Sequence, residues 1–376
     1  MDCLPCLTRK HSVMKTIFTS IFILFFLSAC EKSKNNDSPE TLPDADIKTE
    51  VLTQSLKFPW EMIYGPDNFI WFTERAGKIS RLNPMNGVIT LVHTITEVTS
   101  QGEGGLLGMA LHPQFSTNPY VYVVYNYGSG NKGKVVRFTF NNGVLSAPLV
   151  LLDQIPASSI HNGSRLLITP DLKLLVTTGD ANAADQAQNT NSLSGKILRL
   201  NLDGSIPSDN PIPNNPLWSY GHRNPQGLVM VNSKLYSSEH GPNNDDEINL
   251  IQKGRNYGWP NVEGACDQAD EKTFCAINNV AEPMMTWTPT IAPSGLTYYN
   301  SDYIPQWKNS LLVVALKGSR LLQLKLDEGG TKITSAKDFL QNQFGRLRAI
   351  CQSPDGKVYI GTSNGTNDQI IEISAR

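Results

Sequence analysis

The sequence lacks an excess of charge of either sign and contains few cysteines. Its 376 residues carry 32 Lys and Arg against 34 Asp and Glu, a formal net charge of -2. This balance argues against a nucleic-acid-binding protein, which would carry a basic surface. The six cysteines are too few for a disulfide-built scaffold and too scattered for a tetrahedral zinc site. Hydrophobic residues make up 40% of the chain, so disorder throughout is excluded.

The first thirty residues predict export. An apolar run from Ile17 to Leu27 follows Lys15 and precedes small residues, as in a secretory signal peptide, and it is short for a membrane span. The segment 27–30, Leu-Ser-Ala-Cys, resembles the lipobox of bacterial lipoproteins, in which the cysteine (here Cys30) is lipidated. We predict a signal peptide over residues 1–29, starting at Met1 or Met14, and a lipid anchor on the periplasmic face of the outer membrane. The alternatives are a soluble periplasmic protein and an uncleaved anchor.

The remainder of the chain predicts a tether and one β domain. Residues 30–50 are polar, charged and proline-containing, which is typical of a flexible tether. Over residues 51–376, short β-type runs alternate with turn residues, and long helical periodicities are missing. A Pro-Asp turn followed by a strand recurs at positions 66, 170 and 354. Repeats of roughly 40 to 50 residues predict an all-β propeller of six or seven blades rather than a β-sandwich pair or a β-helix.

Several loops carry more chemistry than folding requires. Glu103 lies in a glycine-rich loop, and His161 precedes one of the repeat units, although a lone loop histidine is more often a structural hydrogen-bonding group than a base. The loop 221–227 (GHRNPQG) contains two cations and two amides, which suit a ligand with carboxylates or carbonyls. The acids of 245–247 suggest a calcium site made of oxygen ligands, though their spacing is not that of an EF-hand and a solvated acidic turn is the alternative.

Three further cations follow late in the chain. Arg346 and Arg348 are two residues apart in an extended stretch, so both side chains are expected on one side, and Lys317 lies near another blade end. Like charges on one face repel each other unless an anion lies between them. Together with Arg223, they predict a polyanionic ligand at one end of the propeller.

Long motifs in this region resemble the soluble quinoprotein sugar dehydrogenases, the glucose/sorbosone and aldose sugar dehydrogenases. The match runs in order from about Leu56 to Ile373 and includes GKILRLNLDG (195–204), GHRNPQG (221–227), EHGPNNDDEINLI (239–251) and GRNYGWPN (254–261). The resemblance implies a six-bladed β-propeller that uses pyrroloquinoline quinone (PQQ) and calcium. It also implies oxidation of the anomeric hydroxyl of an aldose to a lactone, with electrons passed to an external acceptor such as a periplasmic cytochrome.

The resemblance assigns roles residue by residue. His161 matches the catalytic base, and Arg223 and Asn224 match the pair beside the quinone carbonyls. The groups that match the holders of the cofactor carboxylates are Lys317, Arg346 and Arg348. The groups that match calcium ligands are the carbonyls of Gly241 and Pro242 at the cofactor, and Glu247 with the Tyr257 carbonyl at a second, structural site.

Three departures point to the compact aldose dehydrogenase branch with a broader sugar range. Glu103 replaces a glutamine beside the sugar, and Ile160 replaces an aspartate before the catalytic histidine. The segment 264–286 is shorter than in the glucose-specific members, and it carries Cys266 and Cys275, a plausible disulfide in an exported protein. Two alternative functions, a non-enzymatic binding module and a calcium-dependent lactone hydrolase, are disfavoured because the histidine and the cations are retained.

Overall fold

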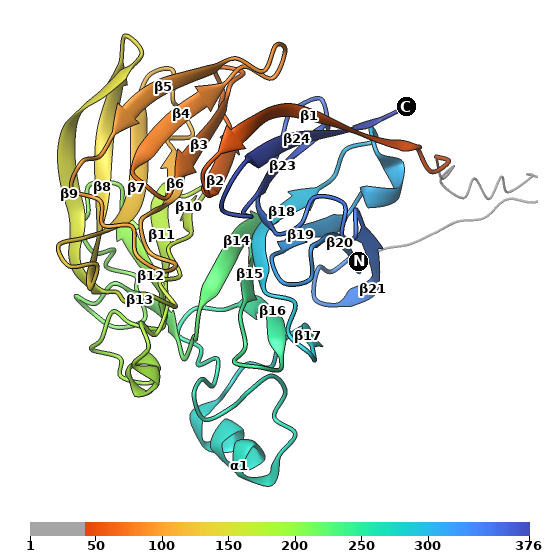
Figure 1. Ribbon diagram of the computed structural model, residues 1–376. Coiled ribbons are helices and arrows are strands. Elements are labelled where there is room, and N and C mark those ends of the chain that lie inside the picture. Colours follow the sequence, from red (N-terminus) through yellow and green to blue (C-terminus); the bar gives the residue numbers. More distant parts are fainter. Residues whose placement is uncertain (1–41) are drawn as a thin grey trace, which may run out of the picture. The chain divides into compact units, whose positions relative to one another are not determined.

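The computed structural model describes residues 42–376, which form six four-stranded antiparallel sheets arranged as the blades of a propeller (Figure 1). This confirms the predicted all-β, six-bladed fold. The predicted signal peptide, the lipidation site Cys30 and the tether up to residue 41 lie outside the described residues. Within the described residues, no helix is long and apolar enough to cross a membrane.

Five blades are built from consecutive strands, and the first strand of each blade lies innermost, in contact with the first strands of its neighbours. Their bounds are β2 (Pro59–Tyr64), β3 (Ile70–Glu74), β4 (Lys78–Leu82), β5 (Ile89–Thr94); β6 (Leu106–Leu111), β7 (Tyr120–Tyr127), β8 (Lys132–Asn141), β9 (Val144–Pro156); β10 (Leu166–Ile168), β11 (Lys173–Thr178), β12 (Lys196–Asn201), β13 (Leu217–Tyr220); β14 (Pro225–Val231), β15 (Lys234–Glu239), β16 (Asp246–Ile251), β17 (Met285–Trp287); β18 (Pro293–Tyr299), β19 (Ser310–Ala315), β20 (Arg320–Leu326), β21 (Ile333–Phe339).

The sixth blade joins the two ends of the described chain. Strands β22 (Leu347–Gln352), β23 (Val358–Thr362) and β24 (Asp368–Ala375) are completed by β1 (Ile47–Leu56), which pairs antiparallel with β24 from Ile47 opposite Ala375 to Leu56 opposite Asp368. Residues 47–50, which the sequence analysis places in the tether, are therefore the first residues of β1. Because this pairing closes the ring, separation of the blades requires the β1–β24 ladder to break.

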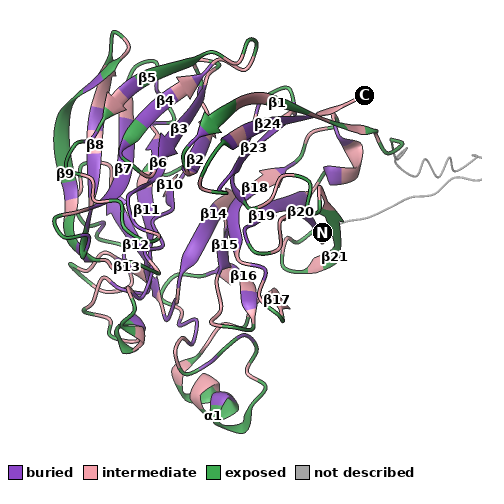
Figure 2. Cartoon of the chain, viewed as in Figure 1, coloured by how far each residue is buried: buried purple, intermediate pink, exposed green. Residues whose placement is uncertain are grey.

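The hydrophobic core lies between neighbouring blades. Both faces of a blade are covered by its neighbours, so inner and middle strands are buried on both sides, whereas outer strands such as β5 and β9 are exposed (Figure 2). The contact between the first two blades is typical: Trp71 packs edge-on against Phe115 and Phe140, with ring centroids 5.7 and 5.0 Å away. Cys351, in β22, is buried and forms no disulfide within the described residues.

One helix, α1 (Ala269–Asn278), projects beyond the blades near β16 and β17 (Figure 1). Its start is stabilised by Glu271, whose carboxylate accepts the Gln268 N–H at 3.0 Å. A disulfide joins Cys266, before the helix, to Cys275 within it, which confirms the predicted pair. Two short 3-10 helices, Ala184–Ala187 and Pro305–Trp307, complete the structure.

Candidate active site

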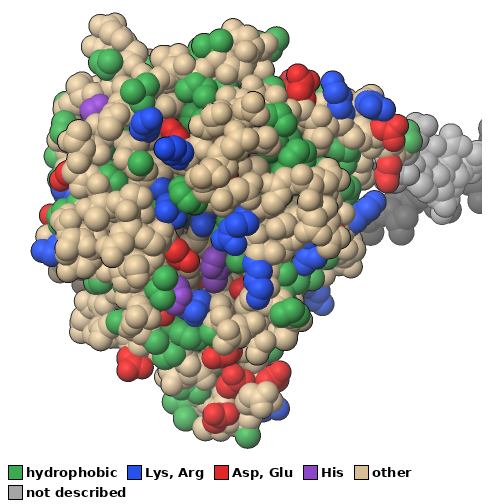
Figure 3. Space-filling model, in the orientation of Figure 1, with side chains coloured by type: hydrophobic (Ala, Val, Ile, Leu, Met, Phe, Trp, Pro, Cys, Tyr) green, Lys and Arg blue, Asp and Glu red, His purple; other side chains and the backbone are tan. Residues whose placement is uncertain are grey.

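The predicted site residues gather at one mouth of the central channel. The inner strands run in the same direction around the ring, so the loops that precede them meet at one end. Glu103 precedes β6, His161 precedes β10, and Arg223 and Asn224 immediately precede β14. Figure 3 shows histidine and acidic side chains in a hollow of the surface, with Lys and Arg side chains around it.

His161 is held by a buried carboxylate. Its Nδ1 lies 2.8 Å from Asp180 Oδ1, and Trp259 Nε1 donates to Asp180 Oδ2 at 2.9 Å. A carboxylate can only accept hydrogen bonds, so Nδ1 carries a proton and Nε2 is left as the acceptor. The side chain of Asp180 is only 2% exposed, against 14% for His161, so the carboxylate supports the ring from beneath. His161 also has a positive φ of 55°. Its backbone N–H donates to Glu103 Oε2 at 3.0 Å.

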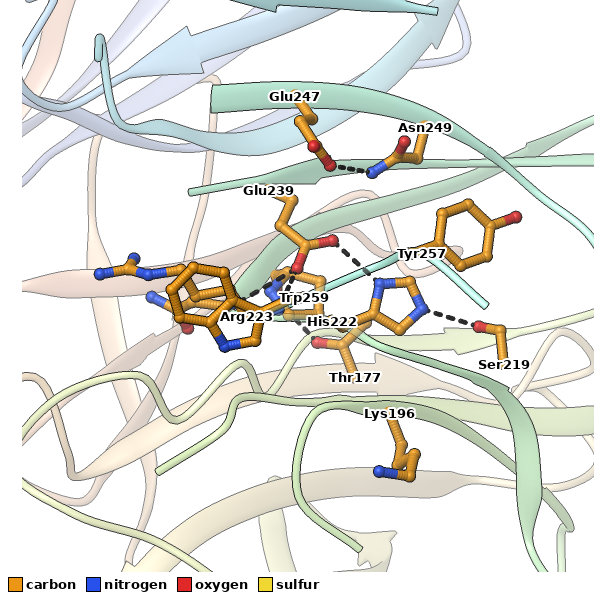
Figure 4. A network of polar contacts seen from close by, with 12 residues as sticks. Thr177, Lys196, Ser219, His222, Arg223, Glu239, Glu247, Asn249, Tyr257 and Trp259 are labelled. Atoms are coloured by element: carbon orange, nitrogen blue, oxygen red, sulfur yellow. Dashed lines mark hydrogen bonds and ion pairs between the residues drawn. The ribbon is translucent and has the colours of Figure 1, made fainter. Parts of the chain in front are cut away.

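Glu239 organises the loop that carries Arg223 and Asn224 (Figure 4). One oxygen of its carboxylate accepts the backbone N–H groups of both residues. The other oxygen accepts from His222 Nδ1 at 2.9 Å, and the hydroxyl of Ser219 lies 2.9 Å from His222 Nε2. This Ser-His-Glu arrangement resembles a hydrolytic triad, but Ser219 and His222 are both 0% exposed. It is therefore a buried support for the loop rather than a nucleophile.

Arg223 faces the mouth with part of its hydrogen-bonding capacity unused. Its guanidinium lies over the ring of Trp259, 5.2 Å from the centroid, and donates to the His240 carbonyl at 3.4 Å. Its Nε is buried without a partner. Burial lowers the pKa of Arg223 from its ordinary value, because a guanidinium loses hydration there. Burial also lowers the pKa of His240 to about 3, so that ring is neutral.

The three late cations differ in burial. Arg348 is 7% exposed, whereas Arg346 and Lys317 are exposed, and Lys317 Nζ donates to Thr290 Oγ1 at 2.8 Å. Within residues 42–376, no acidic side chain forms an ion pair with Arg348. Burial lowers the pKa of Arg348 to about 9; the nearby charge of Glu103 acts against this shift, and the charges of Arg165 and Arg346 add to it. A buried cation without a carboxylate in contact indicates a place for an anion.

The sequence profile of the glucose/sorbosone dehydrogenases matches residues 56–372 of this chain. The chain belongs to the glucose/sorbosone dehydrogenase family. It is 36% identical to quinoprotein glucose dehydrogenase B of Acinetobacter calcoaceticus, with 96% of this chain and 95% of the relative covered. It is 31% identical to the aldose sugar dehydrogenase YliI of Escherichia coli K12, with coverages of 88% and 94%. The PQQ-bound aldose sugar dehydrogenase of Streptomyces coelicolor superposes with a TM-score of 0.77 at 31% identity, covering 89% of this chain and all (100%) of that one.

The donor set at this mouth of the channel fits a quinone carrying several carboxylates. Buried Arg348 has an unpartnered Nε, and so does Arg223, at the same mouth of the channel. The exposed Arg346 and Lys317 add positive charge that a carboxylate can reach without a large desolvation cost. Asn224, in contrast, is 0% exposed, so the structure places it behind the surface of the mouth.

The predicted calcium ligands line one small cavity of about 20 Å³, which holds roughly one water-sized particle. Gly241, Pro242, Glu247 and Tyr257 are all part of its wall, together with Glu239. Burial and the charge of Glu239 raise the pKa of Glu247 well above its ordinary value. Among the described residues, however, no group of three or more His, Cys, Asp and Glu side chains is arranged to hold a metal ion. Main-chain carbonyls would have to supply much of any coordination here.

A second cavity, of about 710 Å³, lies at the other end of the channel. It is lined by the later residues of the inner strands, including Tyr64, Leu111, Ile168 and Val229, and by none of the predicted site residues. An ion pair between Arg165 and Glu61 lies in its wall, and Arg165 stacks over Trp60 at 4.3 Å. The predicted site residues therefore do not line this larger cavity, and cavity size alone would not have located them.

Two groups of functional residues escaped the sequence analysis. Asp180 contacts His161 from 19 residues away in the sequence, and Trp259 contacts Asp180 from 79 residues away. Together they orient the His161 ring. Glu239 and His222 support the Arg223 loop. Asp180 is the acid that ends the repeat unit KLLVTTGD, and Trp259 lies in the GRNYGWPN motif. Neither pattern predicts which residue the side chain contacts.

Proposed function

We propose that this protein is a PQQ- and calcium-dependent dehydrogenase that oxidises the anomeric hydroxyl of aldose sugars to lactones. The observation that carries the proposal is the placement of the His161–Asp180 pair at the same channel mouth as Arg223 and the buried Arg348, which no carboxylate contacts. A base and an anion site at one mouth suit proton removal from a substrate beside an anionic cofactor. The family membership and the PQQ-bound structural relative support the same conclusion.

The chain's own groups divide the work of binding. Lys317, Arg346 and Arg348 would hold the carboxylates of PQQ, and Arg223 with Asn224 would lie at its carbonyl side. When bound, PQQ supplies the hydride acceptor that no side chain can provide. The carbonyls of Gly241 and Pro242 would hold calcium, and they accept no hydrogen bond from the described residues. Glu247 and the Tyr257 carbonyl would hold a second calcium ion in a structural role.

The protein positions and stabilises charge during the reaction. His161 Nε2 accepts the proton of the anomeric hydroxyl, and the Asp180 carboxylate stabilises the imidazolium that forms. The Arg223 guanidinium stabilises negative charge at the mouth, where its fixed position avoids the cost of reorganising solvent. Glu103 uses one oxygen on the His161 N–H, which leaves the other to accept a sugar hydroxyl. The electrons leave to an external acceptor, and we propose export with an N-terminal lipid anchor at Cys30.

The proposal is tested by reconstitution of the purified protein with PQQ and calcium. PQQ binding is followed by its absorption spectrum, and activity by dye reduction with a panel of aldoses. We expect saturable PQQ binding and oxidation of several aldoses, because the substrate side is not built for one sugar. Absence of PQQ binding together with absence of oxidation of every aldose would show the proposal to be wrong.

Asp180→Asn is expected to lower kcat by about 100-fold, the scale on which a correctly presented base contributes. Three donors converge on this carboxylate, from His161, Trp259 and the Asn182 N–H. An amide has only one oxygen, so its NH2 group opposes one of these donors, and the charge that stabilises the imidazolium is lost. PQQ affinity should stay close to wild type in a spectroscopic titration. Asp185→Asn, at an exposed acid, is the matched control, and a kcat for Asp180→Asn equal to that of the control would contradict this role.

Calcium is expected to raise the midpoint of thermal unfolding of the cofactor-free protein by several degrees. The stabilisation follows from binding to the folded state only, about 2.7 kcal/mol at a concentration 100 times Kd. Glu247→Gln should abolish most of the increase, because it removes the buried carboxylate that has no cationic partner. Magnesium is the control ion, since it prefers a smaller octahedral site. Equal calcium-dependent shifts in the wild type and the variant would exclude Glu247 as a ligand.

A further inference from the structure

Gln226 connects three parts of the site that the sequence treats separately. It is the second residue of β14, immediately after the Arg223–Asn224 loop, and it is 4% exposed. Its Oε1 accepts from Arg348 Nη1 at 2.6 Å, and its Nε2 donates to Asn224 Oδ1 at 3.0 Å. Its main-chain carbonyl accepts from Arg165 Nε at 2.8 Å. One buried glutamine thus contacts an amide and two guanidinium groups.

The chemistry of these partners determines how each amide is oriented. A guanidinium can only donate, so Gln226 must turn its oxygen toward Arg348 and its nitrogen toward Asn224. Asn224 must therefore present its oxygen to Gln226, and the same oxygen accepts the Gly163 N–H at 3.0 Å. The Asn224 nitrogen is left on the opposite side, where it lies 3.5 Å from Nδ1 of the neutral His240. Two donors, the Gly163 N–H and Gln226 Nε2, therefore hold the Asn224 oxygen in this orientation.

Two neighbouring arginines, Arg165 and Arg348, have partners of different charge. Arg165 is paired with the Glu61 carboxylate, so its charge is compensated. Arg348 is held by a neutral amide instead, so no carboxylate contacts it, and Glu103 offsets its charge only from a longer distance. Both guanidinium groups lie near Trp60, at 4.3 and 5.7 Å from its ring. A carboxylate at position 226 would pair Arg348 as Glu61 pairs Arg165.

We propose that Gln226 is a positioning residue that holds Arg348 without neutralising it and helps to hold the side chain of Asn224. This inference rests on the proposed function, because it concerns the anion site for PQQ. The neutrality of residue 226 leaves Arg348 without a carboxylate in contact, and its amide nitrogen gives the Asn224 oxygen a second donor beside the Gly163 N–H. A buried glutamine that served only for packing would have neither effect.

The first test compares Gln226→Glu, Gln226→Met and the wild type by spectroscopic titration with PQQ. Gln226→Glu should weaken PQQ binding by about 10- to 100-fold, the range for one hydrogen bond to a charged group, because it neutralises Arg348 and places a carboxylate oxygen against Asn224 Oδ1. Gln226→Met removes both hydrogen bonds but adds no charge, so its effect should be several-fold smaller. In an Arg348→Met background, Gln226→Glu should change the PQQ affinity much less. Equal effects of Gln226→Glu and Gln226→Met, or wild-type affinity in Gln226→Glu, would overturn the proposal.

A second test needs no cofactor and uses Gln323→Glu as the matched control. Gln323 is also buried, but its Nε2 donates to the Gln306 carbonyl and to Ser310 Oγ, and no arginine or lysine side chain forms a hydrogen bond with it. Gln226→Glu should lower the thermal midpoint of the cofactor-free protein less than Gln323→Glu, because Arg348 pairs with the new carboxylate. A larger loss for Gln226→Glu would overturn the proposal. If the wild type binds no PQQ, the proposed function fails while this comparison still decides the role of Gln226.

Discussion

Replacing His161 by alanine is expected to lower kcat by about 100-fold or more, while PQQ affinity stays within a few-fold of wild type. The imidazole is the proposed base at the mouth and is fixed by a buried carboxylate, and its Nε2 is directed away from that carboxylate. Its removal leaves only water to accept the proton. Because the imidazole contributes mainly in the transition state of proton transfer, kcat and kcat/KM should fall together. The measurement is steady-state dye reduction at saturating PQQ and calcium.

His93→Ala is the control for this experiment. His93 lies on the outer strand β5 and packs against Phe138 at a centroid distance of 5.3 Å, away from the inner strands. Its removal should affect stability and leave kcat unchanged. If His161→Ala retained kcat within a few-fold of wild type, the base would have to be another group. A loss of PQQ binding in that variant would instead show that the ring contributes to the cofactor site.

Replacing Arg348 by methionine is expected to weaken PQQ binding by about 100-fold or more, which corresponds to the cost of truncating one partner of a buried charge pair. Arg348 is nearly buried, and solvent does not screen it from a bound carboxylate. Arg346→Met should cost only a few-fold, because that side chain is exposed and screened. The structure therefore ranks two cations that the sequence treats as equivalent. Spectroscopic titration at two salt concentrations measures both effects.

The stability of the cofactor-free Arg348→Met protein provides an independent check. Burial of an unpaired cation is unfavourable, as the lowering of its pKa to about 9 indicates. Removal of that cation should leave the thermal midpoint equal to or higher than that of the wild type. A lower midpoint with weaker binding would indicate that the arginine serves mainly to hold the fold. Unchanged PQQ affinity would remove Arg348 from the anion site.

The site contains charged groups that make the free protein less stable but bind ions of opposite charge. Arg348 is buried without a counter-ion, and Glu247 has a raised pKa beside a second carboxylate. Both are unfavourable in the isolated chain, and both become favourable when an ion of opposite charge binds. We therefore expect the loaded protein to be considerably more stable than the protein without PQQ and calcium.

The sequence by itself determined the propeller, the loops that carry the chemistry and the family. Strand periodicity and turn residues act over a few positions, so they can be read locally. Arg223 stands in a long motif, and the pair Cys266–Cys275 was identified correctly because the two cysteines are close in sequence.

Only the tertiary structure decided which partners these residues have. Asp180, Trp259 and His161 come from different loops, and Gln226 meets Arg348 across 122 residues. Such contacts depend on the rotation between blades, which arises from packing over the whole ring and has no local signal. Burial is decided in the same way: Arg346 and Arg348 are two residues apart, but only one is covered by neighbouring inner strands. That difference, produced by packing, separates an exposed charge from the buried charge proposed to bind the cofactor.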